Sequence, residues 1–439
     1  MRFLKFFYAF PILMGNLLII SGCYEASGPQ NEFVQTVELD TTTHPHSTTR
    51  QFQRMVFFAD NQWFVFYSDG ADCLYKVSID GVSWSTPHIM DKGIGGSSNI
   101  DVTYRDNLFY YFNSLDVNPD PDKRKMALFA QKGSVGDQHI EWGEKYRVFK
   151  NDDSDYNFMY SSVSMDPDGI LWAASRHWSH SGHFHDVVVS RTLQPFNITS
   201  WSPGMASLKT NDPKSLAPQI IGLGAGKAYL TGKATEKGKI FGNFYDGVRW
   251  DNKDQMVGES TTVGGDDKRM SMVYEPGNES STGRVHLVYI DDKDHVRYRV
   301  LSVPDGVPNW TPPLDQSGEL VVKDSKGRPI NAFSCILSID SSEQPALIYL
   351  LYGETKWRGK DPRAIRGELR LTRNADGIWS NRSLLMSEYG EKHNIYPNMN
   401  ENTDKKIGIL YTKVRNDQRI IMFSSADKRD VDNFFNKAR

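Results

Sequence analysis

The sequence predicts an all-β protein, a seven-bladed β-propeller whose last blade is closed by an N-terminal strand. Six tryptophans recur at separations of 58, 59, 49, 60 and 69 residues: Trp84, Trp142, Trp201, Trp250, Trp310 and Trp379. Upstream of each one, short apolar and aromatic segments alternate with turns. A repeat of this length that holds four short strands is typical of a propeller blade.

Most of these tryptophans follow a tight turn built on an Asp-Gly pair. Blade one carries Asp80-Gly81-Val82-Ser83-Trp84, and blade four carries Asp246-Gly247-Val248-Arg249-Trp250. Glycine adopts a positive φ without penalty, so Asp-Gly indicates a hairpin between two strands, and the tryptophan then begins the fourth strand. No segment longer than about ten residues has a helical apolar period, so the sequence predicts no substantial helix.

The end of the chain supplies three strands of a seventh blade and no fourth. These strands are expected at Ile395–Asn398, Lys406–Tyr411 and Arg419–Ser424. Near the N-terminus, Phe33–Leu39 alternates apolar and polar residues and has no partner of its own. If it is the outer strand of blade seven, it closes the ring and removes an exposed edge. The alternative is six blades with loose ends.

The first 23 residues have the pattern of an export signal. Arg2 and Lys5 precede an apolar segment, Phe6–Ile20, which is too short for a comfortable membrane span. It ends in Ile20-Ser21-Gly22-Cys23, which matches the bacterial lipobox, whose cysteine is lipidated; an ordinary signal peptide is the alternative. We expect a signal peptide over 1–23, a tether over 24–32 and one propeller domain over 33–439. Tyr24, in place of Asp, implies the outer membrane in a Gram-negative host.

Composition narrows the expected partners. Hydrophobic residues make up 39% and charged residues 24% of the chain, as in folded globular proteins. The net charge of −3 and the scattered Lys and Arg give no electrostatic footprint for nucleic acid. We expect a monomer that meets the membrane only through its lipid, with no cofactor. Cys73 and Cys335 are expected as buried thiols, and no His or Cys spacing indicates a metal site.

Strand geometry tells where a site would lie. In each blade the first strand begins and the second strand ends on the same face, which surrounds the mouth of the central channel. The Asp-Gly turns lie on the opposite face and are expected to be structural. Polar candidates at the mouth are Arg54, Asn157, Tyr160, Arg176, His177, Lys233, Arg269, His393 and Tyr396.

One loop concentrates histidine. The segment from Arg176 to His185 holds four of the 11 histidines of the chain. Their spacing matches no standard zinc ligand set, and a solvated polar loop is the simplest alternative. His177 is the strongest candidate, because it lies at a strand end where its position is fixed.

These motifs resemble a known family. The Asp-Gly-x-x-Trp turns resemble the repeats of BNR, or Asp-box, propellers, which include sialidases. Blade three, with Ser164–Trp172 followed by His177, is similar to the corresponding stretch of propeller-type ulvan lyases. Those lyases carry a first His where this chain has Asn157, and their blade-four Tyr and Arg are replaced near Leu216 and Lys233. A complete sialidase arginine triad cannot be assigned.

The resemblance implies an enzyme acting on an acidic polysaccharide, as a lyase or a sialidase-like glycoside hydrolase. Elimination at a uronate needs a base, an acid and a group that neutralises the carboxylate. We assign His177 as base and Tyr160 as acid. Arg54, Lys233 and Arg269 would bind carboxylate or sulfate, with Asn157, Arg176, His393 and Tyr396 as further contacts. One alternative is a non-catalytic binder that stacks sugars on Trp178, Phe184 and Trp357. Another is an envelope scaffold.

Overall fold

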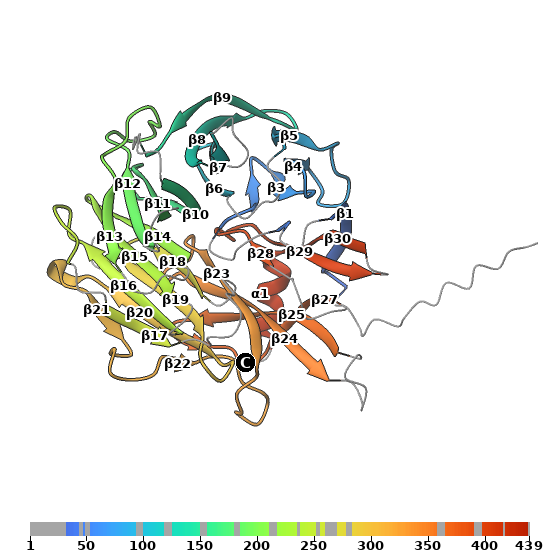
Figure 1. The fold of residues 1–439 in the computed structure, drawn as a ribbon. Coiled ribbons are helices and arrows are strands. Elements are labelled where there is room, and N and C mark those ends of the chain that lie inside the picture. Colours follow the sequence, from blue (N-terminus) through green and yellow to red (C-terminus); the bar gives the residue numbers. More distant parts are fainter. Residues whose placement is uncertain are drawn as a thin grey trace, which may run out of the picture.

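The computed structural model describes residues 32–43, 47–48, 53–93, 100–117, 125–149, 156–179, 185–209, 217–234, 238–251, 255–259, 270–277, 283–357, 365–389, 397–415 and 418–437. Within these residues the chain forms seven antiparallel sheets, arranged one after another as blades (Figure 1). The predicted seven-bladed β-propeller is therefore confirmed.

The blades follow the order of the sequence, and each begins with its innermost strand. Blade one holds β2 (Val56–Ala59), β3 (Gln62–Ser68), β4 (Cys73–Ser78) and β5 (His88–Asp91); blade two holds β6 (Asp101–Arg105), β7 (Leu108–Asp116), β8 (Met126–Val135) and β9 (Ile140–Arg147). Blade three holds β10 (Tyr156–Met165), β11 (Leu171–Ser179), β12 (His185–Arg191) and β13 (Met205–Lys209); blade four holds β14 (Ala217–Gly224), β15 (Lys227–Ala234), β16 (Lys239–Tyr245) and β17 (Gln255–Glu259).

The last three blades carry additions. Blade five holds β18 (Met270–Glu275), β19 (Arg284–Ile290), β20 (Val296–Ser302) and β21 (Asn309–Thr311), with β22 (Glu319–Leu320) also on β20. Blade six holds β23 (Ala332–Asp340), β24 (Leu347–Trp357), β25 (Ile365–Ala375) and β26 (Ile378–Trp379), with β27 (Leu384–Tyr389) also on β25. Blade seven holds β28 (Asn398–Met399), β29 (Lys406–Arg415), β30 (Gln418–Asp427) and β1 (Gln35–Thr42).

The N-terminal strand closes blade seven, as predicted. Strand β1 pairs with β30 along its whole length, from Gln35 opposite Ser425 to Thr42 opposite Arg419. Because this pairing fills the outer position of the blade, β30 has no free edge on that side. The alternative of six blades with loose ends is wrong.

Two faces of the ring can be defined from strand direction. The loop face is the one on which innermost strands such as β2 begin and second strands such as β3 end. The turn face is the opposite one, and it carries the Asp-Gly turns, among them the turn that joins β4 to β5. Strand β30 ends on the turn face, so its antiparallel partner β1 begins there.

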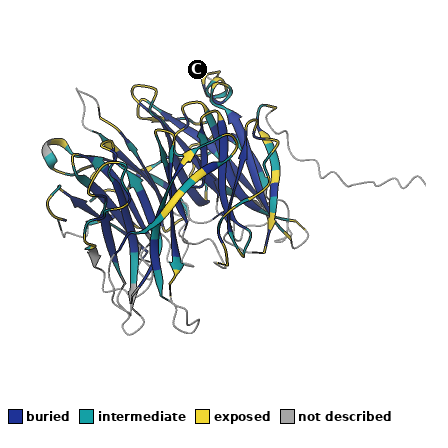
Figure 2. Cartoon of the chain, turned by 90° about the horizontal axis from the view of Figure 1, so that it is seen from above, coloured by how far each residue is buried: buried dark blue, intermediate teal, exposed yellow. Residues whose placement is uncertain are grey.

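Most strand residues are buried, and exposed residues lie at the turns and along outer strands such as β1 and β9 (Figure 2). Trp63 and Trp172 are fully buried, and Trp84 of blade one packs edge-on against Phe423 of blade seven at 4.9 Å. Cys73 and Cys335 are both buried and form no disulfide, as expected.

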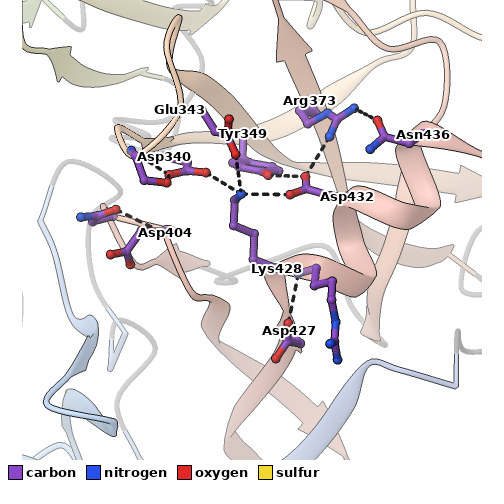
Figure 3. A network of polar contacts seen from close by, with 12 residues as sticks. Asp340, Glu343, Tyr349, Arg373, Asp404, Asp427, Lys428, Asp432 and Asn436 are labelled. Carbon is purple, nitrogen blue, oxygen red and sulfur yellow. Dashed lines mark hydrogen bonds and ion pairs between the residues drawn. The ribbon is translucent and has the colours of Figure 1, made fainter.

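A C-terminal helix was missed by the sequence analysis. Helix α1 (Lys428–Asn436) follows β30 directly and is only nine residues long, which explains why no helical period was evident. Lys428 Nζ lies 2.8 Å from the buried carboxylate of Asp340 and 3.0 Å from Asp432 (Figure 3). Asp432 also accepts hydrogen bonds from Tyr349 and Arg373 of blade six. The helix thereby fastens blade seven to blade six.

Candidate functional site

Four of the predicted site residues lie together at the loop-face end of blade three. Asn157 and Tyr160 are on β10, and Arg176 and His177 are on the neighbouring β11. Phe158 is paired with His177 and Met159 with Arg176 in the strand register. This end of the blade therefore carries a cluster of polar side chains on two hydrogen-bonded strands.

The ring of His177 belongs to a stack of three rings. It lies 5.2 Å from the ring of Phe158 at an interplanar angle of 25°, and Phe158 stacks on Phe149 at 4.5 Å and 14°. Both phenylalanines are buried, whereas His177 is half-buried. The stack fixes the plane of the imidazole at the edge of the core.

A bulge in β10 sets the direction of Tyr160. The register slips by one residue between Met159 and Ser162, and Tyr160 has a φ of 57°. Among the non-glycine residues of positive φ in the described ranges, Tyr160 is the one inside a strand. Such a conformation costs about 1–3 kcal/mol and is concentrated at functional sites.

The bulge separates Tyr160 from His177. In a regular strand Tyr160 would share a face with Phe158 and His177, because side chains alternate. Instead its ring lies under the guanidinium of Arg176, with 5.1 Å from Cζ to the ring centroid. The two side chains assigned as base and acid thus project from opposite faces of the blade, and both catalytic roles remain predictions.

Arg176 is half-buried. Burial lowers the pKa of its guanidinium, and the neighbouring Tyr160 opposes that shift. A guanidinium stays charged even so, because its ordinary pKa lies far above neutral pH. Arg176 therefore presents a poorly hydrated positive charge beside an aromatic ring, which suits a carboxylate or sulfate ligand.

Asn157 has a positioning contact. It is 2% exposed, and its Oδ1 accepts a hydrogen bond of 2.7 Å from the backbone N–H of Met126, at the start of β8 in blade two. Asn157 therefore ties the loop-face ends of blades two and three together. Its role in substrate binding is untested.

Arg54 lies at the axis of the ring. It is 4% exposed, and its guanidinium donates hydrogen bonds to the carbonyls of Met272 (3.2 Å), Leu337 (2.9 Å) and Met399 (3.5 Å). These carbonyls belong to the innermost strands of blades five, six and seven. The contacts give Arg54 a cross-linking position in the core, and its substrate-binding role stays a prediction.

Of the remaining predicted positions, the structure describes the backbone of Lys233 alone. The backbone of Lys233 is at the loop-face end of β15, paired with Ala217. Arg269, His393, Tyr396 and Cys23 lie outside the described residues. In the ranges that the structure describes, no group of His, Cys, Asp and Glu could hold a metal ion, and no helix is long and apolar enough to cross a membrane.

A second polar cluster, between blades five and six, was missed by the sequence analysis. His286 Nε2 lies 3.0 Å from Glu275, and His286 Nδ1 is bonded to the hydroxyl of Tyr298. Arg284 donates two hydrogen bonds to the same carboxylate, at 2.7 and 2.8 Å. Arg284, His286 and Tyr298 line a cavity of about 610 Å³.

The charges in this cluster follow from its hydrogen bonds. Burial opposes ionisation of Glu275, but the bonds from His286 and Arg284 outweigh it and lower the pKa of the carboxyl to about 2. Burial lowers the pKa of His286, which favours the neutral ring, and Nε2 of this ring is the nitrogen that faces the Glu275 carboxylate. The sequence did contain a signal for this cluster. Glu275 ends one strand and His286 lies near the start of the next, so the alternation of side chains in an antiparallel pair could have placed them on the same face.

Comparison with known proteins identifies the fold only. No family model matches the chain, and no curated protein matches it in sequence. An ulvan lyase from a new family of polysaccharide lyases is similar in structure, with a TM-score of 0.53 and 11% identity over 88% of this chain and 95% of that one.

Two other carbohydrate-active proteins are similar at a lower level. Trypanosoma rangeli sialidase gives a TM-score of 0.46 and 12% identity, over 89% of this chain and 59% of its own length. Penicillium chrysogenum α-L-arabinanase gives 0.45 and 10%, over 90% and 98%. The chain spans less than two thirds of the sialidase.

Proposed function

We propose that this protein acts on or binds an acidic polysaccharide at the loop face of blade three. The observation that carries the proposal is the imidazole of His177, which is stacked on the Phe149–Phe158 pair and is next in sequence to the half-buried cation Arg176. A flat ring at a fixed angle suits contact with a sugar, and a poorly hydrated guanidinium suits its carboxylate. The name of the similar ulvan lyase supports the same class of ligand.

In the catalytic form of this proposal, the protein is a polysaccharide lyase. His177 removes the C5 proton of a uronate, since an imidazole titrates near neutral pH. Arg176 shares the other face of the blade with Tyr160, so it would reach the carboxylate from around the rim, and neutralising that carboxylate makes the proton more acidic. An acid must then protonate the departing oxygen, and Tyr160 can reach it only around the rim of the blade. The Asp-Gly-x-x-Trp turns would be shortened Asp-box repeats.

A non-catalytic binder is the second candidate. It is favoured by the opposite directions of Tyr160 and His177, because a binder needs no acid and base on one side of a sugar. In this form the protein would hold the glycan for a neighbouring enzyme or transporter.

The proposal includes export and a lipid anchor at Cys23. Cys23→Ala should move the protein from washed membranes to the soluble fraction without changing its melting temperature, because lipid attachment is remote from the blades. If the variant stays in the membranes, another anchor must exist.

The function is tested with purified residues 24–439 and a panel of acidic polysaccharides. Binding and the absorbance of unsaturated products are measured on one preparation. If His177 is the base, the His177→Ala variant should have a turnover that is lower by about 100-fold or more and an unchanged melting temperature. As a binding residue it should lose affinity only. His139→Ala, an exposed histidine on the turn face, is the control. If neither wild-type binding nor turnover occurs with any acidic polysaccharide, the proposal is wrong.

A further inference from the structure

The turn face carries an exposed aliphatic side chain at the same place in four blades. The residue after the glycine of the Asp-Gly turn is Val82, Val248, Val307 or Ile378, exposed by 48%, 84%, 63% and 74%. Leu193, in the equivalent turn of blade three, is 61% exposed. With Ile79 they make six of the nine large hydrophobic side chains exposed in the described ranges.

Turn formation does not explain these side chains. The carboxylate of Asp80 accepts hydrogen bonds from the backbone N–H groups of Val82 and Ser83, and Asp246 does the same for Val248 and Arg249. The turn therefore uses only the backbone at the position after glycine. A polar residue at this position would form the same turn. Single exposed apolar residues are common on protein surfaces, but an exposed apolar residue repeated at the same position in several blades is not.

The chain itself indicates what these side chains meet. Strand β1 begins on the turn face, where Gln35 pairs with Ser425. A Cβ at Gly81 would lie 3.2 Å from the hydroxyl of the same Ser425, so the start of β1 and the Asp-Gly turn of blade one are neighbours. Residues 24–32 can span at most about 30 Å. A lipid on Cys23 therefore keeps the start of β1, on the turn face, within about 30 Å of the bilayer.

We propose that the turn face rests on the lipid bilayer and that Val82, Leu193, Val248, Val307 and Ile378 enter its interface. The inference rests on the lipid anchor of the proposed function. Apolar side chains that enter the interface bury apolar surface there in addition to the attached lipid. In this orientation the loop face, with His177, points away from the membrane towards polymer.

The test uses the full lipidated chain in phosphatidylcholine vesicles. Val248→Cys is labelled with nitrobenzoxadiazole, and Val117→Cys, an aliphatic position 40% exposed on the loop face, is the matched control. Cys73 and Cys335 are buried, so the label goes to the introduced thiol. We expect a blue shift and quenching by spin-labelled lipid at position 248 and neither at 117.

Several outcomes would overturn the proposal. In the first, the probe at position 248 stays exposed to water although the protein is bound to the vesicles. The exposed aliphatic side chains would then be a contact surface for a protein partner. The others are quenching at 117 instead, and failure of the chain to associate with vesicles at all. Polysaccharide binding by the same labelled samples is measured in parallel. Retained binding without quenching at 248 refutes the orientation and leaves the proposed polysaccharide function intact.

Discussion

The backbone N–H of Arg54 donates a 2.7 Å hydrogen bond to Asp101, and both residues are buried at the centre of the ring. The second oxygen of Asp101 accepts from the N–H of Val163, also at 2.7 Å, while the Arg54 guanidinium reaches across to blades five, six and seven. Arg54 and Asp101 belong to consecutive blades, one and two. Together with these two blades, their hydrogen bonds connect six of the seven blades.

This centre should govern the stability of the whole ring. Arg54→Met leaves three carbonyls without their donor and Asp101 without a neighbouring cation, so we expect the free energy of unfolding to fall by about 3–5 kcal/mol. The measurement is urea denaturation followed by tryptophan fluorescence. Arg415→Met, which breaks an exposed ion pair with Glu38, is the control and should cost at most about 1 kcal/mol. Equal losses in the two variants would show that the axis has no special role.

Closure by β1 should decide solubility. Deleting residues 24–42 removes the strand and exposes the edge of β30, so the protein should melt earlier and aggregate. Deleting residues 24–32 alone keeps β1 and should change neither property. Melting by calorimetry and size-exclusion chromatography test both truncations. A long truncation that melts and elutes like the short one would contradict the closure.

The Glu275–His286 pair should make stability fall on acidification. The pKa of His286 is lower in the folded protein, so the unfolded chain binds its proton first, at an ordinary pKa of 6.5. The contribution of the neutral His286 to the free energy of unfolding is present above about pH 6.5 and is lost as the pH falls below that value. Glu275 adds a second loss between its ordinary pKa of 4.5 and its folded value of about 2.

His286→Gln isolates the first of these losses. The variant should show a flatter dependence of unfolding free energy between pH 7 and 5, while the loss due to Glu275 remains. His139→Gln leaves the buried cluster intact and should follow the wild type. Urea denaturation over this pH range gives the slopes. An unchanged slope in His286→Gln would mean that the buried ring does not control the pH response.

The positive φ of Tyr160 should reverse the usual order of alanine and glycine. Glycine normally destabilises a strand relative to alanine by roughly 0.5–1 kcal/mol. At φ 57° alanine keeps the strain that glycine relieves, so Tyr160→Gly should be more stable than Tyr160→Ala by about 1 kcal/mol. The same pair at Met159, which lacks a positive φ, should show the normal order. Urea midpoints decide this, and a normal order at both positions would rule out strain at Tyr160.

The architecture of this protein can be predicted from its sequence. A blade is specified by local signals, namely the spacing of Trp84 and its equivalents, the Asp-Gly turns and the alternation within each strand. These signals act over a few tens of residues, so the number of blades could be counted without knowing any contact between them. The closing strand was predicted from one further observation. Phe33–Leu39 had no partner strand and blade seven lacked its fourth strand, so pairing the two removes an exposed edge.

The contacts of the polar side chains could not be predicted in this way, because they depend on residues far apart in the sequence. Arg54 was assigned to the channel mouth, but its guanidinium bonds to Leu337, 283 positions away, and no local pattern reports such a contact. Tyr160 and His177 were assigned to one site on the assumption of a regular strand. A slip of one residue after Met159 turned Tyr160 to the other face. Side-chain direction in a strand has a period of two, so one bulge reverses what sequence spacing predicts.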